Sequence, residues 1–205
     1  MPNTTIDLIK SMPQNNKPYG YQGEAIAKLD EYFALGRNIP TKRKSGVIVM
    51  PTGSGKTFTS VSWLLDKAAA NGYQIIWLVH QQELVTQAYD TIKNMSPILK
   101  NYNFKNITIV PISSKHYTIS QAGGADIIVG CIQSFASRKG IKYLNFITRG
   151  KGRNKLVVVI DEAHHASSDS YQLVLKQFEK YNPNLILLGM TATPTRMIEA
   201  QKRRF

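Results

Sequence analysis

The sequence predicts an α/β domain with a doubly wound, mostly parallel sheet and helices on both faces. Short apolar and often β-branched runs recur along the chain, and segments with helical spacing separate them. The runs are continuously apolar, as is typical of strands that are buried on both faces. Repeated alternation of strand and helix favours a parallel sheet.

Six runs are expected to be strands, namely 47–50, 75–79, 107–110, 127–130, 156–160 and 185–189. Four segments between them are expected to be helices, namely 56–70, 81–95, 133–138 and 170–181. The longer surface loops are expected at 40–45, 111–124 and 152–155. Ligands gather at the carboxyl ends of the strands in such sheets, so residues that directly follow a strand are the first candidates for a functional site.

Composition limits the class of protein. The 205 residues are 42% apolar, which suffices for one sizeable core and predicts one domain. Charged residues make up 19% of the chain, so its net charge of +13 does not indicate a disordered polycation. The apolar runs are far shorter than the ~20 residues that span a bilayer, so we expect no membrane partner. A single cysteine, Cys131, excludes an internal disulfide and indicates a reducing compartment, so we expect a cytoplasmic or nucleoid-associated protein.

The basic excess is unevenly distributed. Seven Lys and Arg residues and no acidic residue lie between Asp126 and Asp161, and the span between Glu31 and Asp66 is also free of acids. Such blocks favour a polyanionic partner, but they are equally typical of solvated loops that aid solubility. Their position relative to other motifs has to decide between the two.

A phosphate-binding loop follows the first predicted strand. Gly53 and Gly55 allow the backbone N–H groups to curl around a triphosphate, Lys56 reaches the β and γ oxygens, and Thr57 supplies a hydroxyl to Mg²⁺. The strict pattern has Gly where this chain has Met50, a departure that leaves the cradle itself intact. The loop reads Pro51-Thr52-Gly53-Ser54-Gly55-Lys56-Thr57.

Two carboxylates follow the strand expected at 156–160. Asp161 and Glu162 end a strand that is expected to be buried. Removing their charges from water costs free energy unless a cation or hydrogen bonds compensate them. Asp161 fits a ligand of Mg²⁺, partly through water, and Glu162 fits the base that activates the attacking water. An exposed helix start would also suit acidic residues, but the phosphate loop favours the catalytic interpretation.

These segments together resemble motifs I, II and III of superfamily 2 helicases and translocases of the DEAH type. The strand-end motifs are Pro-Thr-Gly-Ser-Gly-Lys-Thr at 51–57, Asp-Glu-Ala-His at 161–164 and Thr-Ala-Thr at 191–193. Further segments resemble the Q-motif at 21–26, motif Ia at 78–84 and motif Ib at 129–134. The likeness is greatest to the branch that includes restriction-subunit and DNA-repair helicases, and it implies the first RecA-like, ATP-binding domain.

The resemblance implies roles at the nucleotide. Gln22 is expected to recognise adenine, because a carboxamide can donate and accept at once. Tyr19 stands where relatives often have Arg, and it is expected to stack on the base. Tyr21 and Gln22 can also be explained as an ordinary amphipathic helix start. The ATP-binding set is Tyr19, Gln22, Thr52, Gly53, Ser54, Gly55, Lys56 and Thr57, and the catalytic set is Glu162, Lys56 and Asp161.

The resemblance also implies coupling to nucleic acid, with DNA favoured over RNA. His164 is expected to hydrogen-bond toward Thr191 or Thr193, whereas His165 is expected to be a surface residue. The basic loop 149–155 is expected opposite the ATP site. Nucleic-acid contacts are expected from the segments around motifs Ia and Ib, namely His80, Gln81, Gln133, Ser134, Arg138 and Lys139.

The implied organisation is an N-terminal extension at 1–16, the ATP-binding domain at 17–197 and a basic tail at 198–205. Helicases of this class use a second RecA-like domain that supplies an arginine finger, worth ~10³–10⁵ in rate. We therefore expect this chain to bind ATP with Mg²⁺ but to hydrolyse it very slowly without that domain. A nucleotide-dependent binding module stays open as an alternative function.

Overall fold

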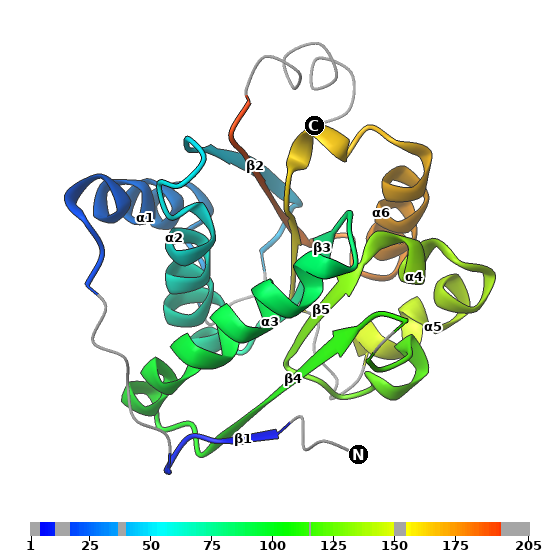
Figure 1. Cartoon of the computed structure of the whole chain (residues 1–205), viewed down its shortest axis with the longest axis horizontal. Coiled ribbons are helices and arrows are strands. Elements are labelled where there is room, and N and C mark those ends of the chain that lie inside the picture. The colour runs from blue at the N-terminus through cyan, green and yellow to red at the C-terminus, as the bar shows by residue number, and fades with distance from the viewer. Residues whose placement is uncertain (1–4, 11–16, 37–39, 115, 150–154, 194–205) are drawn as a thin grey trace.

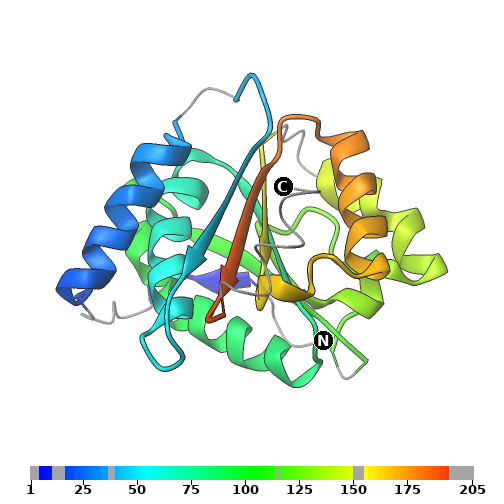
Figure 2. The same ribbon diagram turned by 90° about the horizontal axis from the view of Figure 1, so that it is seen from above.

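The computed structural model describes residues 5–10, 17–36, 40–114, 116–149 and 155–193, which form a seven-stranded sheet between two layers of helices (Figures 1 and 2). The strand order is β1-β4-β5-β3-β6-β7-β2, and β1 alone pairs antiparallel. The predicted doubly wound, mostly parallel sheet is confirmed. The strands are β1 (Thr5–Asp7), β2 (Lys44–Val49), β3 (Gln74–Val79), β4 (Asn106–Ile112), β5 (Ile127–Cys131), β6 (Leu156–Ile160) and β7 (Ile186–Thr191).

Helices cover both faces of the sheet, as the sequence predicts. In both views α1, α2 and α3 lie on one side, and α4, α5 and α6 lie on the other (Figures 1 and 2). In the described part of the chain, no helix is long and apolar enough to cross a membrane. The α-helices are α1 (Gly20–Phe33), α2 (Lys56–Trp63), α3 (Glu83–Met95), α4 (Ile132–Ala136), α5 (Arg138–Arg149) and α6 (Asp169–Tyr181).

Each central strand contributes to two cores. In β6, Val157 and Val159 belong to the cluster under α1, α2 and α3, whereas Val158 and Ile160 belong to the cluster under α4, α5 and α6. All four side chains are fully buried. Because successive side chains point to opposite faces, burial on both sides requires an unbroken apolar run. This is the physical reason for the continuous apolar strands in the sequence.

The N-terminal segment extends the sheet beyond the predicted strands. Ile6 pairs with Ile107 of β4 in antiparallel register, and the neighbouring Leu8 is fully buried. This segment lies within the predicted N-terminal extension at 1–16. A three-residue edge strand has no periodicity that could be detected, so only its partner β4 reveals it.

Helix α5 lies in the basic block after Asp126, where the sequence predicts a helix only as far as residue 138. Leu144 and Ile147 on its inner face are fully buried against the sheet. Gln74 of β3 donates from Nε2 to the backbone oxygens of Ile147 and Ala125, at 2.8 and 2.9 Å. The buried carboxamide therefore ties the end of α5 to the sheet, a tertiary contact that no local pattern indicates.

The predicted loop at 111–124 is partly ordered. Its first two residues extend β4, and Ile119–Gln121 forms a 3₁₀ turn in which Ile119 is buried beside Ala122. The predicted helix at 56–70 is also irregular, because α2 passes into a π-helical turn at Leu64–Ala68.

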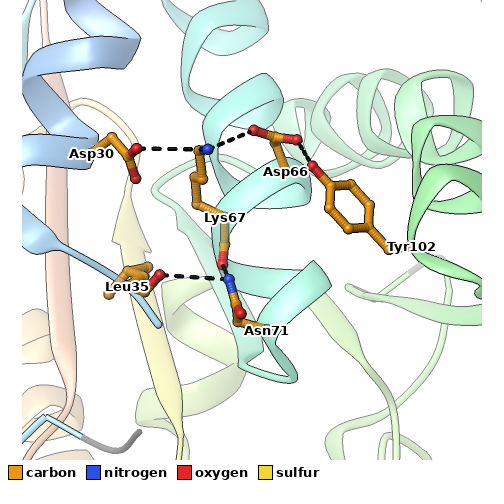
Figure 3. Close-up of polar contacts among 6 residues, drawn as sticks. All are labelled: Asp30, Leu35, Asp66, Lys67, Asn71 and Tyr102. Atoms are coloured by element: carbon orange, nitrogen blue, oxygen red, sulfur yellow. Dashed lines mark hydrogen bonds and ion pairs between the residues drawn. The ribbon is translucent and has the colours of Figure 1, made fainter. Parts of the chain in front are cut away.

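Polar contacts surround this π-helical turn (Figure 3). Lys67 Nζ lies 3.2 Å from Asp66 Oδ2 and 3.6 Å from Asp30 Oδ2 on α1. Tyr102 donates its hydroxyl hydrogen to Asp66. The hydrogen bond and charge of Asp66 raise the pKa of Lys67. These side chains are about one-third exposed, so each ion pair contributes at most about 1 kcal/mol, and the Lys67–Asp30 pair joins α1 to the π-helical turn.

Candidate active site

The predicted functional segments follow four adjacent strands, β2, β7, β6 and β3. The parallel register pairs Val49 with Thr191 and Ile160 with Gly189. At the strand ends, the backbone N–H of Met50 donates to the Thr191 oxygen at 3.1 Å, and that of Asp161 donates to the Leu78 oxygen of β3 at 2.9 Å. The phosphate loop, motif II and motif III therefore meet at one edge of the sheet.

The phosphate loop forms a tight turn before α2. Gly53 and Gly55 have φ values of 79° and 81°, which L-residues rarely adopt. Lys56 begins the helix, and its Nζ donates to the Met50 carbonyl at 3.3 Å, so the ammonium folds back over the loop. The side chain of Met50 is buried in the core, and only its carbonyl takes part in this contact. Met is therefore tolerated where the strict pattern has Gly.

Gln22 connects α1 to the phosphate loop. Its side chain is buried, with Nε2 donating to the Ser54 oxygen at 2.9 Å and Oε1 accepting from the Tyr19 N–H at 3.0 Å. The second contact belongs to a capping box at the start of α1. The residue thus serves both as a helix start and as a partner of the loop, while adenine recognition stays a prediction.

Tyr19 lies at the mouth of this region. Its side chain is 70% exposed, and its ring stacks on that of Tyr21 with centroids 6.1 Å apart and an interplanar angle of 11°. The Tyr21 hydroxyl donates to the Ser54 oxygen at 3.1 Å. An exposed, oriented aromatic face next to the loop is suited to stacking on a base.

Alanine substitutions at Gly53 and Gly55 distinguish the cost of backbone strain from the cost of a steric clash in the free energy of unfolding. A Cβ at Gly55 would lie 2.4 Å from Gln22 Nε2, whereas a Cβ at Gly53 would meet nothing within 4 Å. Both alanine variants incur the left-handed backbone cost of roughly 1–2 kcal/mol. We expect Gly55→Ala to lower the free energy of unfolding by a further ~1 kcal/mol or more, as overpacking does. Chemical denaturation of the two variants measures the difference, and equal losses would contradict the Gln22 contact.

Motif II presents its carboxylates in a strained turn. Glu162 has φ 51°, and its N–H donates to Asp161 Oδ1 at 3.0 Å. Burial and the neighbouring Glu162 charge raise the pKa of Asp161, while Lys56 acts in the opposite direction. Lys56 and Asp161 therefore lie within electrostatic range of each other. Backbone strain of this kind often accompanies functional sites.

A close approach of backbones holds motif II on β7. A Cβ at Gly189 would lie 2.8 Å from the Cβ of Ala163, so only glycine lets the turn after β6 pack this tightly. His164 then reaches Thr191 at 3.5 Å, from Nδ1 to Oγ1, and Glu162 Oε2 at 3.3 Å. Thr193 contacts Thr191 through its own N–H at 3.2 Å. Of the two partners predicted for His164, the structure brings Thr191 to it.

His165, predicted to be a surface residue, is only partly exposed. Its side chain is half-buried, and its ring lies between those of His164 and His80, with centroid distances of 4.2 and 4.3 Å. His80 follows β3 while His165 follows β6, and these strands are neighbours in the sheet. The sequence shows that His164 and His165 are adjacent. Only the pairing of β3 with β6 brings the ring of His80 to them.

The predicted nucleic-acid contacts follow β3 and its other neighbour in the sheet, β5, with two of them in the first turn of α5. β3 and β5 pair in parallel, and Gln133 Nε2 donates to the His80 oxygen at 3.2 Å. Cys131 is buried, and burial raises the pKa of its thiol. Gln81 and Gln133 are exposed, Ser134 is half-buried, and Arg138 and Lys139 are exposed in the first turn of α5.

The basic loop at 149–155 lies mostly outside the described residues. Lys155 marks its end, directly before β6 and thus at the edge opposite the phosphate loop. Its Nζ donates to the Asn71 and Gly36 oxygens at 3.1 and 3.2 Å, and burial lowers its pKa. The Lys155 ammonium is therefore bound by backbone oxygens of the protein itself.

The chain matches the family described as "Type III restriction enzyme, res subunit" over residues 15–196. It is 30% identical over 179 residues to the putative mitochondrial ATP-dependent helicase irc3 of Schizosaccharomyces pombe, a match covering 84% of this chain and 25% of that protein. The chain spans about a quarter of the length of the curated relatives it matches.

Solved structures share the fold. A DEAD box protein from the hyperthermophile Methanococcus jannaschii superposes with a TM-score of 0.61 at 21% identity, covering 93% of this chain and 48% of that one. The Sulfolobus solfataricus SWI2/SNF2 ATPase core in complex with dsDNA superposes with a TM-score of 0.57 at 14% identity, and the match covers 93% of this chain and 35% of that one. The chain has the fold of these helicase ATPase domains, and it belongs to the type III restriction enzyme res-subunit family.

Proposed function

We propose that this domain binds Mg·ATP and couples its hydrolysis to movement on nucleic acid, together with a second RecA-like domain in cis or in trans. The observation that carries the proposal is the convergence of Lys56 with Asp161 and Glu162 at the ends of β2 and β6, which are separated only by β7. The partial coverage of longer helicase relatives supports a second domain.

The residues of the phosphate loop fit a triphosphate. Gly55 adopts the left-handed backbone that the loop requires, and its missing Cβ leaves room for the Gln22 side chain against the loop. Lys56 neutralises phosphate charge, and the N-terminus of α2 directs backbone N–H groups toward it. The proposed ATP-binding set is Tyr19, Gln22, Thr52, Gly53, Ser54, Gly55, Lys56 and Thr57.

Magnesium would neutralise charge that develops on the phosphates. Among the described residues, no group of three or more His, Cys, Asp or Glu side chains could hold a metal by itself. Such a sparse donor set fits Mg²⁺, which keeps several waters and binds through one or two carboxylates plus phosphate oxygens. We assign Thr57 and Asp161 to the ion, with Glu162 as the base that takes the proton of the attacking water.

The basic excess and the exposed side chains around motifs Ia and Ib support a nucleic-acid partner. Lys139 and Arg138 lie in the first turn of α5, where backbone N–H groups also favour phosphate. One structural neighbour is a complex with dsDNA, and the family description names a restriction enzyme, so we favour DNA over RNA. Assignment to the DEAH type and localisation in the cytoplasm stay predictions, and one relative is named mitochondrial.

Binding of single-stranded DNA is expected to weaken steeply as salt rises. Each phosphate contact contributes a slope of about 0.7 in log affinity against log salt for single strands. Arg138→Ala combined with Lys139→Ala should therefore reduce the slope by roughly 1.4, because two contacts are lost. Fluorescence anisotropy with labelled oligonucleotide at several salt concentrations measures this. Lys105→Ala, which removes an exposed charge before β4, is the control and should leave the slope nearly unchanged.

The coupled activity is tested by measuring ATP hydrolysis of the two-domain protein with single-stranded DNA, duplex DNA and RNA. Stimulation by one of them supports a motor and identifies its track. ATP binding without stimulation by any of the three would instead support a nucleotide-dependent binding module.

A further inference from the structure

We propose that His165 is a positioning residue that links the nucleotide site to the nucleic-acid-binding loops through three tilted imidazole rings in contact, His164, His165 and His80, here called the histidine stack. The inference rests on the proposed function, because it assumes that both ligands bind. The structure supports it by an uninterrupted series of contacts from motif II to motif Ib.

The nucleotide end of the stack is His164. Its Nδ1 lies 3.3 Å from Glu162 Oε2 and 3.5 Å from Thr191 Oγ1, so it contacts the proposed base and motif III together. The preceding Ala163 packs tightly against Gly189 of β7. A shift of the carboxylate when nucleotide binds or leaves therefore moves the ring of His164, because the turn offers it little free space.

The centre of the stack is His165. Its ring is tilted by 41° against His164 and by 30° against His80, at centroid distances of 4.2 and 4.3 Å. The centroid distances lie just below the range of about 4.5–7 Å typical of aromatic pairs, so the His165 ring contacts both neighbouring rings. All three side chains are half-buried, which limits the space in which each ring can turn.

The nucleic-acid end of the stack is His80. Within the described residues its Nδ1 is buried without a hydrogen-bond partner, so ring packing rather than that nitrogen fixes its orientation. Its backbone oxygen accepts from Gln133 Nε2 at 3.2 Å, which joins motif Ia to motif Ib. The next residue is the exposed Gln81. Movement of His80 thus reaches both loops that are proposed to contact phosphates.

In coupling of this kind, binding of one ligand changes the affinity for the other. The change is typically roughly 5- to 150-fold. The expected role of His165 is therefore visible in the ratio of two affinities and not in either affinity alone. By linkage, the same factor must be found whichever ligand is varied.

The test measures anisotropy of labelled single-stranded DNA on the full chain, with and without Mg²⁺ and a non-hydrolysable ATP analogue. We expect a coupling factor of at least about fivefold in the unmodified chain and near one in His165→Ala, with each separate affinity changed by less than about twofold. His165→Phe retains an aromatic ring and should retain the coupling. His116→Ala is the matched control, because His116 is the one histidine of the four outside the stack.

The outcomes are separable. Absence of binding of both ligands to the unmodified chain would contradict the proposed function itself. Binding of both with no coupling in the unmodified chain, or full coupling in His165→Ala, would overturn the role of His165. Loss of coupling in His165→Phe together with a lowered melting temperature would indicate a packing role only, and would equally overturn it.

Discussion

Replacement of Lys56 by alanine is expected to weaken Mg·ATP binding by roughly 10- to 150-fold, the equivalent of the 1.5–3 kcal/mol that a hydrogen bond to a charged group contributes. Lys56 begins α2 and folds over the phosphate loop, where its ammonium contacts the Met50 carbonyl. It also lies within electrostatic range of Asp161. The next lysine along the chain is Lys67, which pairs with Asp66 and Asp30, so it does not replace the charge at the loop.

Titration calorimetry with ATP and Mg²⁺ measures this loss. Lys105→Ala serves as the control, because it removes the same charge from an exposed position before β4. The fold of the Lys56 variant is checked by its melting temperature, which should change little since the side chain is half-buried and outside both cores. Unchanged ATP affinity in Lys56→Ala would refute the assignment of the phosphate loop.

Glu162→Gln is expected to leave ATP binding nearly intact while hydrolysis falls by ~10²–10⁴, the usual contribution of a general base. Glutamine keeps the shape of the side chain and an oxygen for the 3.3 Å contact with His164, but it cannot accept a proton. The left-handed backbone at this position is strained equally for both residues. The variant therefore removes basicity with little change in geometry.

The rate is measured in the two-domain protein, because turnover of this domain alone is expected to lie near background. Glu31→Gln on the exposed face of α1 is the matched control and should hydrolyse ATP normally. Hydrolysis at the unmodified rate in Glu162→Gln would show that another group positions the water. Loss of ATP binding would instead identify Glu162 as a metal or structural ligand, and would reverse the proposed division between the two carboxylates.

The cores could be predicted from sequence because burial on both faces demands continuous apolar strands, as in β6 and β3. The phosphate loop could be predicted as well, because positive φ at Gly53 and Gly55 is a local requirement. Helix α5 was missed because its basic residues concealed a buried face that becomes evident only against the sheet. Strand β1 was missed because three residues carry no periodicity.

By itself the sequence determined the fold class, the order of the strands along the chain and the residues that end each strand, since these depend on local hydrophobicity and backbone preference. The tertiary structure alone decided which strand ends are neighbours. The order β3-β6-β7-β2 places His80 beside His165, a pair that the sequence does not predict, and it selects Thr191 as the partner of His164. The tertiary structure also brings Gln22 of α1 against Ser54 and Gly55 of the phosphate loop. Such contacts arise from hydrogen-bonded pairing between distant strands and from packing of α1 on α2, and neither leaves a signal in any single segment.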